Sequence, residues 1–378
     1  MSRKVALPPE PRLPKYQELA QRLRDRIAAG ELKPGNQLPS FAQMSAEYGI
    51  GQSTLERVYV LLERDGLIVR DPGRGTFVAN PADAIQTTGV VAFIDPFGNY
   101  QHPYNAYLMQ GLQNGARQLG LDLLVLHDTN GIGERKVDGL IVVVSHPASF
   151  FKFLPTGIPR VSAIYPHEGI SSVSANDRQG IVDEVGHLYA LGHRNIGFLT
   201  TGCTSNPDVL SGKRLEAYHE SLRNLGIKAK PRWVRSLEAP WSMRSGTQNA
   251  SFVERGREKM KEWLQDDWDS LGCTALLCQN DDTAIGVIET LLAEGYKVPG
   301  DVSVVGFDGT ERAEFFRPRL TTVRVPLHEI GERSVQLLHE IIHQAADARA
   351  LGPRSVVLPV ALQLGDSAAS IEAIAESA

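Results

Sequence analysis

Short apolar runs alternate with amphipathic helical patterns along most of this 378-residue chain. The run 89–94 precedes a helical pattern at 107–119, and the runs 139–144, 274–278 and 302–307 are apolar almost without interruption. Such strands belong to parallel sheets that helices cover on both faces. About 280 residues are involved, more than one α/β core comfortably holds, so the pattern predicts a two-lobed, doubly wound α/β body.

The remaining elements of the body are predicted from the same alternation. Strands are predicted at 89–94, 121–126, 139–144, 159–165, 196–200, 274–278 and 302–307, and helices at 107–119, 182–191, 210–225 and 283–294. The stretch from Leu126 to Val137 leaves about ten residues for a crossover. Parallel strands usually need a dozen or more, so we expect the helix of that crossover to be missing.

The first 80 residues show a different pattern, in which helices precede a hairpin. Apolar positions recur at helical spacing in 16–27 and again in 55–62. Ser40 and Gln43 have the spacing of a capping box, which predicts a short helix from Ser40 to Tyr48. β-Rich runs on both sides of a glycine-containing loop predict a hairpin. This order of elements predicts a winged helix-turn-helix.

The exposed groups of this head suit a DNA duplex. The third helix opens with short polar side chains, which can reach base edges in a major groove, and with free amides, which can reach phosphates. The hairpin tip places an arginine between glycines, a combination that suits a minor groove or the phosphate backbone. The predicted DNA-binding residues are Ser40, Gln52, Ser53, Thr54, Arg57, Arg70, Gly73, Arg74 and Gly75.

The charge is divided unevenly along the chain. The net charge is −5 overall, with +3 in residues 1–80 and −8 in the remainder, which fits a DNA-facing head on an acidic body. The three cysteines, Cys203, Cys273 and Cys278, lie in or beside apolar runs, so reduced, buried thiols are favoured over a disulfide or a metal site. No apolar run approaches the roughly 18 residues of a membrane span, and we expect a cytoplasmic protein.

Residues 15–79 resemble the DNA-binding domain of the GntR family. The shared motifs are YQELA at 16–20, AGELKPG at 29–35, LPS at 38–40, LERDGL at 62–67 and GRGTFV at 73–78. The resemblance implies a homodimer on a two-fold operator, with half-sites about one helical turn apart.

This head departs from the family at three arginine positions, which are Ala42, Gln52 and Glu56 here. Arg57 is expected to replace part of the lost charge. Glutamine prefers adenine where arginine prefers guanine, so we expect an operator richer in A·T pairs. The alternative is a head that no longer reads DNA and only packs; Arg57, Arg70 and the intact hairpin tip argue against it.

The body resembles the sensor of the LacI/GalR family, which has a periplasmic-binding-protein fold. The shared motifs are VDGLI at 137–141, LGHRNIG at 191–197, KRLEAY at 213–218, NDDTAIG at 280–286, GYKVPGDVSVVGFD at 295–308 and PRLTTV at 318–323. The resemblance implies that a ligand binds between two lobes and that the chain crosses between them near 166–172, 319–325 and 345–353. A GntR-type head on this sensor resembles arabinose-repressor-type regulators, whose effector is a sugar or sugar derivative.

Six residues are the candidates for binding that effector. Charged and amide groups can bond adjacent hydroxyls, and an aromatic ring can cover the C–H face of a sugar. Arg214, Asn280 and Asp308 match hydroxyl-binding positions of the family, and Trp241 matches a stacking position. Asp95 and Phe97, after the first strand, are expected to face them from the other lobe. The alternative for each alone is structural: Asp308 in a turn, Asn280 as a cap, Trp241 in the core and Asp95 in a loop. Asn176 and Asp177 reverse the family's usual order, so their ligand role is open.

The sequence shows no Ser-His-Asp motif, P-loop or G-x-G-x-x-G turn, and its histidines lack metal-ligand spacing, so we expect no enzyme, no cofactor and no metal. We predict a DNA-binding domain at 1–80, a linker at 81–88, a two-lobed effector-binding and dimerisation domain at 89–365 and a flexible tail at 366–378. The predicted function is a sugar-controlled repressor; the alternative is a cytosolic sugar-binding or sugar-processing protein with a vestigial head.

Overall fold

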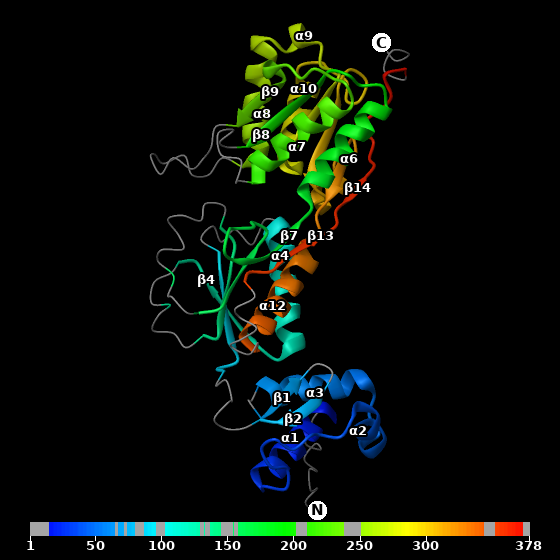
Figure 1. The fold of residues 1–378 in the computed structure, drawn as a ribbon. Helices are drawn as coiled ribbons and strands as arrows, with labels where there is room; N and C mark the ends of the chain where they lie inside the picture. Colours follow the sequence, from blue (N-terminus) through cyan, green and yellow to red (C-terminus); the bar gives the residue numbers. More distant parts are fainter. Residues whose placement is uncertain are drawn as a thin grey trace, which may run out of the picture.

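The computed structural model describes the chain in three parts, a head and two lobes (Figure 1). The described residues are 15–64, 67–71, 74–79, 87–95, 103–128, 132, 137–144, 154, 158–201, 210–237, 251–343 and 352–372.

The head is the predicted winged helix-turn-helix. Its elements are α1 (Lys15–Ala28), α2 (Phe41–Tyr48), α3 (Gln52–Arg64), β1 (Ile68–Asp71) and β2 (Gly75–Val78). The two strands pair antiparallel, and Leu23, Met44 and Leu62 pack into a core of the head's own. Ser40 caps α2 in a full capping box, as predicted, and Gly49 ends the helix at φ +64°, a left-handed conformation that favours glycine.

The lower lobe is a six-stranded, fully parallel sheet in the order β13-β7-β6-β5-β3-β4. The strands are β3 (Val90–Ile94), β4 (Asp122–Leu126), β5 (Gly139–Val142), β6 (Arg160–Ala163), β7 (Ser171–Ala175) and β13 (Ser355–Leu358). Helices α4 (Pro103–Leu119) and α12 (Leu327–His343) pack against each other beside this sheet. The crossover between β4 and β5, expected to lack its helix, lies mostly outside the described residues.

The upper lobe has a second six-stranded sheet in the order β14-β12-β11-β10-β8-β9, in which only the edge strand β14 runs antiparallel. The strands are β8 (Ile196–Thr201), β9 (Val234–Leu237), β10 (Ala275–Cys278), β11 (Ser303–Asp308), β12 (Thr321–Arg324) and β14 (Ala361–Gln363). The helices are α6 (Asp177–Ala190), α7 (Leu210–Asn224), α8 (Phe252–Asp266), α9 (Trp268–Leu271), α10 (Asp281–Ala293) and α11 (Glu311–Phe315), with a 3-10 turn, η2 (Pro231–Trp233). The two sheets confirm the predicted doubly wound α/β class.

The chain passes between the lobes at positions that differ from the expected ones. β7 belongs to the lower sheet and α6 to the upper lobe, so the first crossing lies at Asn176 and not at 166–172. The second follows β12, at 325–326, just past the expected 319–325. The third lies at 359–360, between β13 and β14. The expected crossing at 345–353 was wrong, because the elements before and after it, α12 and β13, both belong to the lower lobe.

Residues 366–372, which we expected to belong to a flexible tail, are part of the upper lobe. Ser367 is fully buried, accepts a hydrogen bond from the amide of Thr321 at 2.9 Å, and donates to the carbonyl of Val304 at 2.6 Å. The amide of Ile371 donates to Leu191 at 2.9 Å. The upper lobe therefore continues to about residue 372. Among the described residues, no helix combines the length and apolar character that crossing a membrane requires.

Candidate functional site

The first turn of α3 presents the polar side chains that the sequence analysis assigned to base edges. Gln52 and Ser53 are exposed, and Thr54 is half-buried. The apolar residues Leu55, Val58 and Leu62 lie on the opposite side of the helix, in the core of the head. Burial of this stripe fixes which face of α3 is available to a duplex.

The hairpin tip is built to expose one arginine. The side chain of Arg74 is 76% exposed and forms an ion pair with Asp71 at 3.0 Å. Gly75 has φ +127°, and a Cβ there would overlap the side chain of Gln37, which donates to the carbonyl of Arg74 at 2.9 Å. The positive φ therefore favours glycine at position 75. Gly73 lies outside the described residues.

Two further predicted DNA-binding residues already have partners within the head. Ser40 accepts the amide of Gln43 as the cap of α2. Arg70 forms ion pairs with Glu56 and, at 3.3 Å, with Glu63, both on α3.

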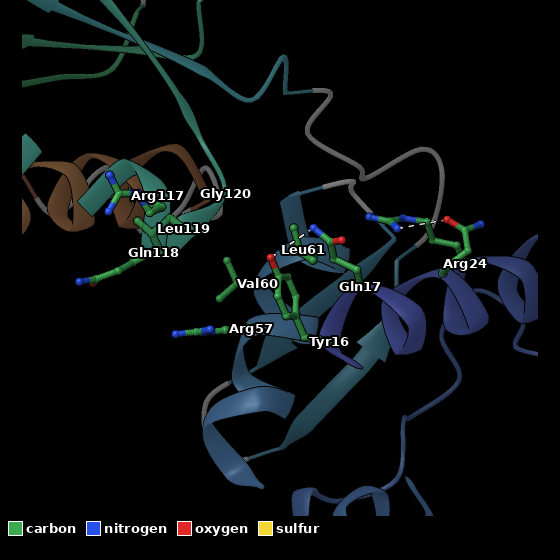
Figure 2. A pocket seen from close by; sticks show the side chains of 11 residues that line it. Tyr16, Gln17, Arg24, Arg57, Val60, Leu61, Arg117, Gln118, Leu119 and Gly120 are labelled. Carbon is green, nitrogen blue, oxygen red and sulfur yellow. Dashed lines mark hydrogen bonds between the residues drawn. The ribbon is translucent and has the colours of Figure 1, made fainter. Parts of the chain in front are cut away.

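Arg57, in the second turn of α3, lies on the side of the helix that faces the body. Its guanidinium lies 5.9 Å from the ring centre of Tyr16 on α1, beside a hollow between head and body (Figure 2).

Between the lobes, Arg214 of α7 is the centre of a buried charge pair. It is 3% exposed and donates from Nε to Asp177 Oδ1 at 2.8 Å and from Nη1 to the carbonyl of Gln279 at 2.6 Å. Its guanidinium stacks 3.7 Å from the ring centre of Phe307. Asp177 opens α6 directly after Asn176, which caps that helix. The Asn176-Asp177 order that differs from the family thus supplies a cap first and a counter-ion second.

Asp308 ends β11 beside this pair and lies close to two tyrosines of the lower lobe. Its φ of +114° is unusual for a residue with a side chain. Burial raises the pKa of its carboxyl well above the ordinary value, against the opposing charge of Arg214. Burial also raises the pKa of Tyr104 strongly and that of Tyr165 to about 12, and the charges of Arg214 and Asp308 act on both phenols. Groups from both lobes therefore converge here.

Of the other predicted effector residues, one lies at the expected place, one caps a helix and two lie outside the described residues. Asp95 is buried at the end of β3, and its charge acts on Tyr165, so it lies on the expected side. Asn280 caps α10, because its Oδ1 accepts the amide of Thr283 at 2.9 Å, which is the structural alternative considered for it. Phe97 and Trp241 lie outside the described residues.

Sequence reasoning missed the tyrosines of the lower lobe and left Asp177 open. Tyr104 stands at the start of α4 and Tyr165 in the turn before β7, and neither lies in a motif that marks it. Asp177 stands out in the sequence because the Asn-Asp order is reversed there. Its pairing with Arg214 could not be predicted locally, because the two residues are 37 positions apart.

His193 and the two cysteines of the described part of the chain are structural. His193 is fully buried and bonds Thr274 at 2.8 Å and Ser303 at 3.0 Å. Cys273 and Cys278 are free and buried, and burial raises the pKa of both thiols. Within the described ranges, no group of His, Cys, Asp and Glu has the arrangement of a metal site.

Two family profiles match the chain in separate places. Residues 15–78 match "Bacterial regulatory proteins, gntR family", and residues 185–368 match "Periplasmic binding protein-like domain". The head and sensor predicted above are both confirmed. The chain is thus a GntR-type DNA-binding domain fused to a LacI-type, periplasmic-binding-protein-like sensor, the composition of a transcriptional regulator.

Two relatives match the chain nearly end to end, and a third matches half of it. The chain is 27% identical over 363 residues to the arabinose metabolism transcriptional repressor of Geobacillus stearothermophilus, covering 89% of this chain and 93% of that protein. The repressor of the same description from Halalkalibacterium halodurans is 23% identical, covering 91% and 93%. The HTH-type transcriptional regulator GalR of Escherichia coli is 31% identical over half of each chain.

Solved structures share the fold of the body. The lac repressor dimer bound to operator has a TM-score of 0.61 at 20% identity, covering 75% of this chain and 96% of that one. A LacI family regulator from Enterococcus faecium with bound ribose has a TM-score of 0.60 at 21% identity, covering 75% and 99%. The regulator CelR in complex with cellobiose has a TM-score of 0.62 at 21% identity, covering 87% and 100%.

Proposed function

We propose that this protein is a homodimeric transcriptional repressor that acts on DNA in the cytoplasm and is controlled by a sugar or sugar-derived effector. The two relatives that match nearly end to end are described as arabinose metabolism repressors, and similar structures contain ribose and cellobiose. The observation that carries the proposal is the convergence of Arg214 and Asp308 with Tyr104 and Tyr165 between the lobes of a body that bears a DNA-binding head.

In this proposal the effector lies between the lobes. Arg214 and Asp308 bond its hydroxyls from the upper lobe, with Asn280 nearby, and the tyrosines and Asp95 face it from below. Phe97 and Trp241 supply aromatic surface. Buried charged groups fix adjacent hydroxyls well, because their hydrogen bonds are charge-assisted.

On the DNA side, Gln52, Ser53 and Thr54 read base edges, and Arg74 reaches the phosphate backbone between Gly73 and Gly75. Ser40 and Arg70 hold α2 and α3 in position, since their bonds run within the head. The protein regulates and does not catalyse, in keeping with the descriptions of its relatives.

Effector control requires that the sugar bind the two states of the protein unequally. A coupling of about 1–3 kcal/mol, or 5–150-fold in operator affinity, is typical of such regulators. Closure of the lobes across the three crossings is the motion that a ligand between them would favour.

The test is operator selection followed by band shifts. The full-length protein selects duplexes from genomic fragments, and the selected duplex is titrated with and without arabinose, ribose, glucose or cellobiose. The proposal predicts a specific shift that one of these sugars changes at least fivefold. A protein that selects no duplex, or whose binding no sugar alters, has another function; sugar binding without DNA binding would identify the sugar-binding alternative.

A further inference from the structure

The head contacts the body through the outward side of α3, the helix proposed to enter the major groove. A hollow of about 610 Å³ separates α1 and α3 from the lower end of α4 (Figure 2). Arg57, Val60 and Leu61 of α3 line it on one side, and Arg117 and Gln118 of α4 on the other. To read bases, α3 would have to enter a major groove about 12 Å wide. The duplex could not approach that side of α3 while α4 occupies the adjacent space.

The lower end of α12 completes this contact next to the hairpin. His339 and His343 stack with ring centres 4.1 Å apart. Burial lowers the pKa of His339 to about 3, and Arg70 of the head adds to that effect. His343 in turn lies near enough to Glu63 of the head to lower the pKa of its carboxyl, which burial raises. Charged groups of the head therefore lie near the end of α12.

The upper ends of the same two helices reach the proposed effector site. Tyr104 is in the first turn of α4, and the charge of Asp308 contributes to raising the pKa of its phenol. α12 begins just after Val325, whose amide donates to the carbonyl of Asp308 at 3.1 Å. Each helix has 17 residues, or about 25 Å of length, and spans the lower lobe from effector site to head.

Glycines let the two helices pack backbone against backbone, so we expect them to move as a pair. A Cβ at Gly331 of α12 would come within 2.5 Å of the carbonyl oxygen of Leu108, and one at Gly111 of α4 would overlap the backbone of His328. Two side-chain hydrogen bonds also join the helices, between Asn114 and His328 at 2.8 Å and from Gln118 to Glu332 at 3.2 Å. Close-packed elements of this kind shift as units and do not deform smoothly.

We propose that this contact is the DNA-released position of the head, and that effector binding stabilises it through the α4–α12 pair. The inference rests on the proposed repressor function. Its occupant is the head of the same chain, and DNA binding requires the head to leave the surface formed by Arg117, Gln118, His339 and His343.

The test uses substitutions on the body, because these leave the DNA-reading residues unchanged. Gln118→Arg adds a cation to a hollow that already holds Arg24, Arg57 and Arg117. The carboxylate of Glu332, which now accepts a hydrogen bond from Gln118 at 3.2 Å, can neutralise only one of these four cations. Gln113→Arg is the matched control: it is the same change on an exposed residue of α4 that does not line the hollow. His343→Ala removes the imidazole at the lower end of α12 that lies near Glu63 of the head.

Hydrogen exchange is measured first, without DNA or sugar. Gln118→Arg and His343→Ala should speed amide exchange in residues 57–63 of α3 relative to the parent and to Gln113→Arg. Equal exchange in all four proteins overturns the proposal, whether or not the protein is a repressor, because the contact would then not form in solution.

Operator affinity is then measured with and without arabinose, ribose, glucose or cellobiose. The parent and Gln113→Arg should lose affinity at least fivefold with the active sugar. Gln118→Arg and His343→Ala should lose less than twofold while binding the sugar as the parent does. Full release in both variants overturns the inference and leaves the repressor function standing, whereas a parent that ignores every sugar overturns both.

Discussion

At the scale of single residues, Glu184 is the least satisfied group in the described part of the core. It is fully buried on α6, and neither carboxylate oxygen has a hydrogen-bond partner among the described residues. Burial raises the pKa of Glu184 well above its ordinary value; Arg214 opposes the shift, and Asp281 and Asp308 add to it. The native protein therefore keeps this proton at pH values where the unfolded chain has released it, so the free energy of unfolding falls as pH rises through that interval.

Glu184→Gln should remove this pH dependence, because an amide does not titrate. Between pH 5 and pH 7 the variant should lose less stability than the parent, by up to about 1.4 kcal/mol per pH unit. Urea unfolding at the two pH values measures the difference. Glu216→Gln, an exposed position on α7, is the control and should behave as the parent. Identical pH dependence in the parent and Glu184→Gln would show that Glu184 is ionised in the native protein.

Glu56, unlike Glu184, is an ion-paired carboxylate at the surface of the head. It occupies a position where the GntR family usually has arginine, and it neutralises Arg70 instead of meeting a phosphate. Glu56→Gln should leave Arg70 paired only with Glu63, which makes the other side of its guanidinium available to the duplex and tightens non-specific DNA binding. If Arg70 then gains one phosphate, the slope of log affinity against log salt steepens by about 0.9.

Fluorescence anisotropy titrations over about 50–200 mM salt measure that slope. Glu18→Gln removes the same charge from an exposed site on α1 and serves as the control. Equal slopes in the two variants would mean that the gain comes from net charge and not from Arg70.

At the scale of elements, the α4–α12 pair depends on the absence of side chains at its crossing. Gly331→Ala should destabilise the lower lobe by about 1–3 kcal/mol, because the new methyl group has no space beside Leu108. Gly186→Ala, in helix α6, meets nothing within 4 Å and should instead stabilise by about 0.5–1 kcal/mol. Thermal unfolding of both variants checks the sign of each change. A stable Gly331→Ala protein would show that the helices can separate at that point.

Element boundaries were predicted best where a local signal marks them. Ser40 and the glycine after Tyr48 gave both ends of α2, since a cap bonds residues three or four positions away. α6 begins at Asp177 and not at 182, because the cap of Asn176 was overlooked. β7, with the sequence SSVSA, was missed because its alternating serines do not form an apolar run, although Ser172 and Ser174 are buried.

At the scale of the whole molecule, a ligand that bridges the lobes should stabilise the body against unfolding. Arabinose, ribose, glucose and cellobiose would be tested by thermal unfolding, and a sugar at about 100 times its Kd should add about 2.7 kcal/mol. Asp308→Asn should lose most of this gain, because an amide accepts hydrogen bonds from hydroxyls more weakly than a carboxylate. Asp122→Asn, exposed at the start of β4, should keep it. Stabilisation that survives Asp308→Asn would place the sugar elsewhere.

The sequence alone determined the class of each domain and showed that the sheets of the body are mainly parallel. Those properties follow from periodicity, caps and turn residues, all of which act within a few positions along the chain. It also gave Arg214 and Asp308 as site candidates, through resemblance. Only the tertiary structure decided which charges neutralise one another, as with Arg214 and Asp177, and where the chain crosses between the lobes. These pairings join residues that are distant in sequence, and packing of the two sheets brings them together.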